Sequence, residues 1–227
     1  MDTFKIHPLR RFYLNTLDFA KQPTRIFLNQ EARFKADCNS ELHRSTYGRP
    51  WNLGSHFFDF MLAQGLKTHH KVLDFGCGSG RLGIHLINYL DAGCYFGIES
   101  HYNSLRAFAH YEIPKARLES KGPRLLLDRE FNFHHFDVKF DQVIETSVTQ
   151  HIYDDALIKK AYTHITETLN DAGDYFVSPR LRLSKNEMHT IGLTHMDDLI
   201  SSFELYTNTE YESNTYWSRY KKNNCGL

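Results

Sequence analysis

Apolar positions along the chain fall either into short continuous runs or into stretches with helical spacing. Continuous runs of four to six residues are typical of strands that are buried on both faces of a parallel sheet. They occupy residues 71–75, 94–99, 140–145 and 173–178. Helical spacing marks residues 54–65, 81–90, 102–111 and the stretch that begins at Asp154 and Asp155. This alternation predicts an α/β fold with a doubly wound, mainly parallel, Rossmann-like sheet.

The two ends of the chain follow other patterns. Residues 203–211 and 214–221 alternate in polarity, which predicts an antiparallel C-terminal hairpin. Residues 1–50 form an N-terminal helical extension or cap in this interpretation, because apolar residues recur at helical spacing between Pro8 and Pro23. Residues 51–227 would form the main domain. Segments 115–139 and 179–205 look irregular, and the second of these, with 1–50, is expected to build a substrate pocket.

A glycine-rich turn follows the first buried run. Asp74 ends an apolar strand, and Gly76, Gly78 and Gly80 follow at alternate positions before the helix at 81–90. Glycine allows a positive φ and a close approach of backbone to a ligand. Open α/β sheets bind ligands at this end of their strands. The Gly78-x-Gly80-x-x-Gly83 spacing also matches a dinucleotide fingerprint, so an NAD(P)-dependent oxidoreductase is one interpretation of the turn.

Two further segments carry polar residues at strand ends. Glu99 closes the second buried run, where a carboxylate can accept hydrogen bonds from both ribose hydroxyls of an adenosine ligand. Residues 140–152 form a strand that opens with Phe140-Asp141, passes Glu145, and reaches His151 after a short turn.

Taken together and in this order, these segments resemble class I S-adenosylmethionine (SAM)-dependent methyltransferases of the small-molecule type, over roughly residues 51–180. The resemblance implies a Rossmann-like sheet with SAM, and its product S-adenosylhomocysteine, at the carboxyl ends of the strands. It implies a cofactor site formed by Asp74, Gly76, Cys77, Gly78, Gly80, Glu99, Ser100, Asp128, Arg129, Glu145 and Thr146. It also favours an aromatic side chain near the sulfonium, with Tyr47, Trp51 and Phe75 as options, and Arg44 or Arg49 against the SAM carboxylate.

The chemistry that follows is an in-line SN2 transfer of an already activated methyl group to an oxygen, nitrogen or carbon acceptor, which needs mainly positioning and desolvation. His151 is the candidate general base because imidazole titrates near neutral pH, and Glu145 is its rival. A SAM-binding protein without transfer activity, with a regulatory or scaffold role, is the alternative.

The amino-acid composition limits the classes of binding partner that we expect. The 227 residues carry 27 basic and 27 acidic side chains, so no net charge favours nucleic acid, and a small-molecule acceptor is expected. No apolar stretch is long enough for a membrane span, and the four cysteines are widely spaced, which predicts a cytoplasmic protein. No metal site is expected, since none of the 14 histidines falls into a zinc-binding spacing. The oligomeric state is open.

Overall fold

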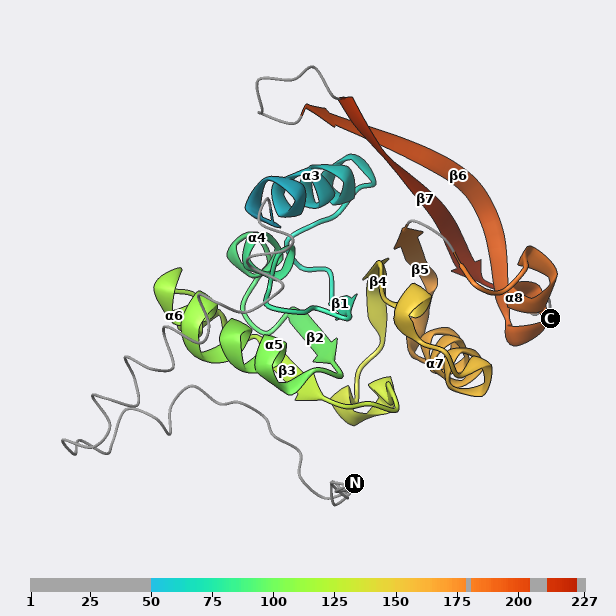
Figure 1. The fold of residues 1–227 in the computed structure, drawn as a ribbon, viewed down its shortest axis with the longest axis horizontal. Helices are drawn as coiled ribbons and strands as arrows, with labels where there is room; N and C mark the ends of the chain where they lie inside the picture. Colours follow the sequence, from blue (N-terminus) through green and yellow to red (C-terminus); the bar gives the residue numbers. More distant parts are fainter. Residues whose placement is uncertain (1–49, 179–180, 205–211, 224–227) are drawn as a thin grey trace.

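The computed structural model describes residues 50–178, 181–204 and 212–223, and within this part seven strands form one sheet (Figure 1). The strand order is β3-β2-β1-β4-β5-β7-β6. The strands are β1 Val72–Phe75, β2 Tyr95–Glu99, β3 Arg124–Leu127, β4 Phe140–Thr146, β5 Leu169–Ser178, β6 Leu193–Glu204 and β7 Glu212–Lys222. The first five are parallel, whereas β7 is antiparallel to both β5 and β6. The predicted Rossmann-like sheet with an antiparallel C-terminal hairpin is therefore confirmed.

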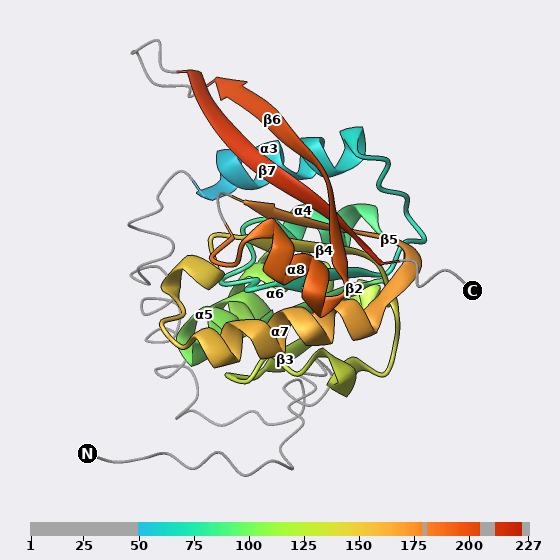
Figure 2. The same cartoon turned by 90° about the vertical axis from the view of Figure 1, so that its right-hand side faces the viewer.

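Helices cover both faces of the parallel strands (Figures 1 and 2). The helices are α3 Pro50–Ala63, α4 Gly83–Tyr89, α5 Tyr102–Ala107, α6 Ile113–Lys115, α7 Asp155–Thr168 and α8 Lys185–Ile191. Short irregular turns of helix, η2 Phe108–Glu112, η3 Glu119–Lys121, η4 Phe133–Phe136 and η5 Thr149–His151, complete the connections. Helices α3, α4 and α5 lie against one face, and α7 and α8 lie against the other. No helix in these described ranges is long and apolar enough to cross a bilayer.

Successive strand residues feed two separate cores, as the period of two requires. Leu73 and Phe75 of β1 belong to the core under α7, whereas Val72 belongs to the core under α3 and α4. The same alternation holds on β4, where Val143 lies in the α7 core and Ile144 lies in the other. The sheet is thus buried on both faces, which explains the continuous apolar runs.

The two segments expected to be irregular contain regular structure. Strand β3 lies within 115–139, and both α8 and the whole of β6 lie within 179–205. Strand β3 has four residues at one edge of the sheet, and β6 lies at the opposite edge, where half-exposed positions weaken the apolar pattern. The hairpin consequently begins at Leu193, ten residues earlier than the predicted range.

Helical structure also continues beyond residue 111, where the predicted helix ends. A π-helical turn over Phe108–Glu112 interrupts the regular hydrogen-bonding pattern, and Pro114 then occupies the first turn of α6. Proline is tolerated there because the first-turn amide lacks a helical acceptor in any case.

Helix α3 is packed closely onto the glycine turn and the hairpin. A Cβ placed on Gly54 would lie 2.0 Å from the carbonyl oxygen of Arg81, so only glycine allows this approach. Farther along α3, Phe60 stacks on Trp217 of β7 at a centroid distance of 4.1 Å. The helix therefore connects the start of the domain with its last strand. The helical extension predicted for 1–50 lies outside the described residues, apart from Pro50.

Candidate active site

The glycine turn has the backbone geometry that the sequence predicts. Gly76, Gly78 and Gly80 have φ values of +74°, +55° and +90°. The amides of Gly76 and Cys77 both donate to the carbonyl of Ile98, at 2.9 and 3.1 Å, which holds the turn against β2. A Cβ on Gly80 would lie 2.2 Å from the ring of Phe108 in η2, so this glycine allows the turn to pack against that ring.

Glu99 joins the end of β2 to this turn. One carboxylate oxygen accepts the backbone N–H of Gly78 at 2.9 Å. The other accepts the amides of Ser100 at 2.7 Å and His101 at 2.8 Å. Three backbone donors compensate for the burial of the charge, since a buried carboxylate without partners is costly. The side chain is thereby held in a defined position at the carboxyl end of the sheet.

Asp74 lies at the base of the same region and is 2 % exposed. Its carboxyl group accepts a hydrogen bond of 2.8 Å from the Tyr95 hydroxyl. Burial raises the pKa of Asp74 to about 7, while the Tyr95 hydrogen bond opposes the shift and the nearby Glu99 charge adds to it. A carboxyl group with this pKa responds to a positive charge placed near it.

These residues form one wall of a cleft with a volume of about 520 Å³. The cleft opens where the strand order reverses between β1 and β4, the place at which α/β sheets bind ligands. The described residues that line it are Leu53, Asp74, Gly76, Cys77, Gly78, Ser79, Arg81, Leu82, Glu99, Ser100, His101, Phe131, Thr146, Ser147, Val148, Gln150, His151 and Ile152.

The opposite wall is the segment between β4 and α7. Ser147 has a φ of +62°, an unfavourable conformation for a residue other than glycine, and its amide donates to the Ser178 carbonyl at 2.7 Å. Strained backbone of this kind is common at functional sites. Gln150 and His151 follow on η5 and are exposed at the cleft.

Four of the predicted site residues do not line this cleft: Gly80, Asp128, Arg129 and Glu145. Asp128 accepts the amides of Glu130 at 2.8 Å and Asn132 at 3.0 Å, so its carboxylate shapes the loop after β3. Arg129 is exposed on the same loop.

Glu145 is fully buried behind the cleft wall. Its carboxyl group accepts the amide of Thr149 at 2.8 Å and the hydroxyl of Thr149 at 2.6 Å. The hydroxyl of Tyr175 donates to its other oxygen at 2.6 Å. Burial raises the pKa of Glu145, and these hydrogen bonds oppose that shift. In this geometry the Glu145 carboxyl group holds η5 against β5 and does not line the cleft.

The structure also bears on the aromatic and arginine side chains that the resemblance placed near the sulfonium and the carboxylate of SAM. Phe75 is fully buried and packs edge-on against Phe131 and Phe133, so it cannot face a sulfonium in the cleft. Tyr47, Arg44, Arg49 and the Trp51 side chain lie outside the described residues.

Several lining residues were not anticipated from the sequence. Arg81 directly follows the last glycine of the turn, a position that could have indicated it. Phe131 reaches the cleft from the loop after β3 with a φ of +52°, and Leu53 reaches it from α3. Neither carries a local sequence signal, because tertiary packing alone brings them to the site.

The domain is Rossmann-like, and its cleft lies at the carboxyl ends of the parallel strands. Comparison with known proteins makes this more specific. Residues 73–175 match the family model described as "Methyltransferase domain". Over these residues the chain is therefore similar to methyltransferase domains.

Solved structures share this fold at low sequence identity. A SAM-dependent methyltransferase from Clostridium acetobutylicum superposes with a TM-score of 0.57 at 13% identity, over 87% of this chain and 99% of its own. Magnesium protoporphyrin IX methyltransferase from Synechocystis PCC 6803, solved with bound SAM, gives 0.55 at 15% identity, over 82% and 97%. An rRNA methylase from Streptococcus thermophilus gives 0.51 at 16% identity, over 74% and 94%. The fold therefore serves acceptors of different classes.

Proposed function

We propose that this protein transfers a methyl group from SAM to a small-molecule acceptor. The observation that carries the proposal is the cleft itself, with Glu99 and the glycine turn on one side and the exposed polar groups of Ser147 to His151 on the other. One wall suits a nucleoside, and the facing wall offers groups that a second substrate can contact.

We infer which side of the cleft binds the cofactor from the chemistry of the residues that line it. Glu99 presents a carboxylate at the end of β2 for the ribose hydroxyls, as the family resemblance implies. The bare backbone of Gly76 to Gly78 leaves space for the methionine part, and Asp74 contributes a carboxyl group below it. The methyltransferase-domain match over both the turn and β4 supports SAM over a nicotinamide dinucleotide.

The acceptor half favours a small molecule. The chain has no net charge that would attract a polyanion, and the cleft encloses about 520 Å³. Val148 and Ile152 add apolar surface to the polar side chains of Gln150 and His151. This mixture of apolar walls and a few polar groups is typical of small-molecule sites.

The transfer step is a direct displacement. A lone pair on the acceptor attacks the methyl carbon in line with the C–S bond, which breaks as its electron pair passes to sulfur and leaves neutral S-adenosylhomocysteine. An acceptor that carries a proton must also lose it. His151 at the cleft is the proposed base for such an acceptor, because the unprotonated nitrogen of an imidazole ring can accept that proton.

The test combines binding and turnover. Calorimetry should give one SAM or S-adenosylhomocysteine per chain and no NAD or NADP binding, and labelled SAM mixed with a metabolite extract should yield a labelled small molecule. With that acceptor, His151→Ala should lower turnover by about a hundredfold with little change in SAM affinity. His189→Ala, an exposed histidine on α8, is the matched control.

Each result has a distinct meaning. Binding of SAM without transfer to any extract fraction would favour the non-catalytic alternative. Transfer to RNA and not to the metabolite fraction would refute the small-molecule acceptor. Full turnover in His151→Ala would leave the methyl transfer intact but remove the base.

A further inference from the structure

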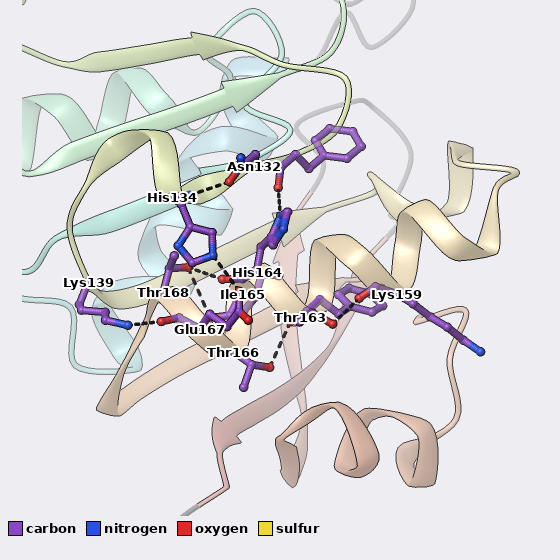
Figure 3. Close-up of polar contacts among 12 residues, drawn as sticks. Asn132, His134, Lys139, Lys159, Thr163, His164, Ile165, Thr166, Glu167 and Thr168 are labelled. Atoms are coloured by element: carbon purple, nitrogen blue, oxygen red, sulfur yellow. Dashed lines mark hydrogen bonds and ion pairs between the residues drawn. The ribbon is translucent and has the colours of Figure 1, made fainter. Parts of the chain in front are cut away.

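A cluster of metal-ligating side chains lies away from the cleft, between η4 and α7 (Figure 3). His134 on η4 meets His164 and Glu167 on α7, and one potential ligand atom from each lies within 4.8 Å of the others. His164 and Glu167 are three residues apart on the helix, so they project from the same face. No metal site was expected from the sequence, because no histidine falls into a zinc-binding spacing. Such spacing rules do not detect ligands that are thirty residues apart and come from different elements.

His164 is oriented as metal-binding histidines usually are. Its Nδ1 lies 2.9 Å from the carbonyl oxygen of Phe131, which can only accept, so Nδ1 carries the proton. In the neutral ring, the other nitrogen, Nε2, then carries the lone pair that can bind a metal ion. A hydrogen bond from the non-ligating nitrogen to a backbone carbonyl fixes both the tautomer and the orientation of the ring.

The contact at the end of helix α7 uses the backbone of Glu167 and not its side chain. Lys139 donates to the backbone carbonyl of Glu167 and not to the carboxylate (Figure 3). The carboxylate lies 2.7 Å from Nε2 of His134, both side chains being about half exposed. In a tetrahedral zinc site with bonds near 2.0–2.1 Å, ligand atoms are about 3.3 Å apart, so small side-chain rotations would accommodate the ion.

We propose that His134, His164 and Glu167 bind a divalent transition-metal ion of the zinc type, with water in the fourth position. Two imidazoles and one carboxylate favour such an ion over magnesium or calcium, which prefer oxygen ligands throughout. The ion ties the loop after β3 to α7, where Lys160 already pairs with Glu130 at 2.7 Å. Phe131 belongs to this loop and lines the cleft, so the site stabilises one wall of the cleft.

The experiment uses the full chain after chelator treatment, titrated with Zn²⁺ by calorimetry and with Co²⁺ by visible absorption. We expect one high-affinity equivalent and a cobalt spectrum of tetrahedral type without a thiolate charge-transfer band. His134→Gln and His164→Gln should each lower Zn²⁺ affinity by about tenfold or more, and Glu167→Gln should act in the same direction. His135→Gln, the neighbouring histidine, should bind Zn²⁺ like the unmodified protein.

A structural readout separates this site from methyl transfer. Zn²⁺ should slow amide hydrogen exchange in residues 128–137 and raise the melting temperature of the unmodified protein, but not of the doubly substituted His134→Gln, His164→Gln protein. Circular dichroism without metal checks that the variants fold. Equal Zn²⁺ affinity in the double variant, or no stoichiometric binding by the unmodified protein, would overturn the proposal and leave an ordinary His134–Glu167 ion pair.

Discussion

Two glutamates lie near the carboxyl ends of β2 and β4, the strands on either side of β1, and their surroundings differ. Glu99 closes β2 and lines the cleft, where three backbone amides hold its carboxylate. Glu145 lies one residue before the end of β4 and is fully buried among Thr149 and Tyr175. In the sequence both are acids at the end of an apolar run, so the sequence alone does not separate them.

Strand register explains the difference. Phe75 pairs with Ile98 on one side and with Glu145 on the other, and laterally paired residues project from the same face of a sheet. Glu145 therefore shares the α7 face with Phe75 and Ile98, which both belong to that core. Glu99 is one position further along its strand than Ile98, so it projects from the opposite face. A shift of one residue decides whether a carboxylate meets the ligand cleft or supports the wall behind it.

The largest expected effect tests the supporting role of Glu145. Glu145→Ala leaves the Thr149 amide, the Thr149 hydroxyl and the Tyr175 hydroxyl without their buried acceptor. Unsatisfied buried groups cost about 1–3 kcal/mol each, so the free energy of unfolding should fall by about 3–5 kcal/mol in urea titrations.

Glu145→Gln is the matched control for that loss. It keeps the volume and one acceptor oxygen, and should recover about half of the stability. An alanine variant as stable as the unmodified protein would mean that the hydrogen bonds around Glu145 do not support η5.

A substitution in the glycine turn is expected to have a comparable effect, but on the affinity for SAM and not on the free energy of unfolding. Gly78→Val places a β-branched side chain at a φ of +55° and displaces the amide that Glu99 holds. SAM affinity should fall about a hundredfold or more, which corresponds to about 2.7 kcal/mol. Calorimetry on the folded variant measures the loss.

Gly122→Val separates strain from site geometry. Gly122 has a φ of +59° and open space around its Cβ position, and it is absent from the cleft lining of the described residues. This variant should lose about 1–3 kcal/mol of stability and keep its SAM affinity. If both valine variants bind SAM as tightly as the unmodified protein, the turn does not hold the cofactor.

A smaller effect is expected at Glu99. Glu99→Gln keeps the shape but replaces one acceptor oxygen by a donor, so the ribose hydroxyls and the Gly78 amide compete for fewer acceptors. The free energy of SAM binding should become less favourable by about 1–3 kcal/mol in calorimetric titrations. Unchanged affinity would remove Glu99 from the cofactor site.

The sequence predicted the sheet and the glycine turn because both depend on local patterns. Continuous apolar runs mark the buried strands, and alternate glycines mark positive φ at Gly76, Gly78 and Gly80. It could not predict that Phe131 and Leu53 reach the cleft, since long-range packing positions them. Edge strand β6 was placed too late because polar residues on its exposed positions obscure the apolar alternation.

The smallest expected effect concerns Asp74, which shares the cleft with Glu99 but carries a pKa of about 7. This value exceeds the ordinary 3.8, so the folded protein without ligand prefers the protonated form, and its stability falls as pH rises from about 4 towards 7. SAM carries a positive charge on sulfur and favours the carboxylate. Binding should therefore release a proton below pH 7, and affinity should rise about tenfold between pH 6 and pH 8.

Two variants isolate this titration. Asp74→Asn should make SAM affinity nearly independent of pH over that range, apart from any titration of SAM itself. Tyr95→Phe removes the hydrogen bond that lowers the Asp74 pKa, and so should move the midpoint of the affinity profile to higher pH. Calorimetry in two buffers with different ionisation enthalpies measures the released proton directly. Proton release that persists in Asp74→Asn would assign the titration to a group other than Asp74.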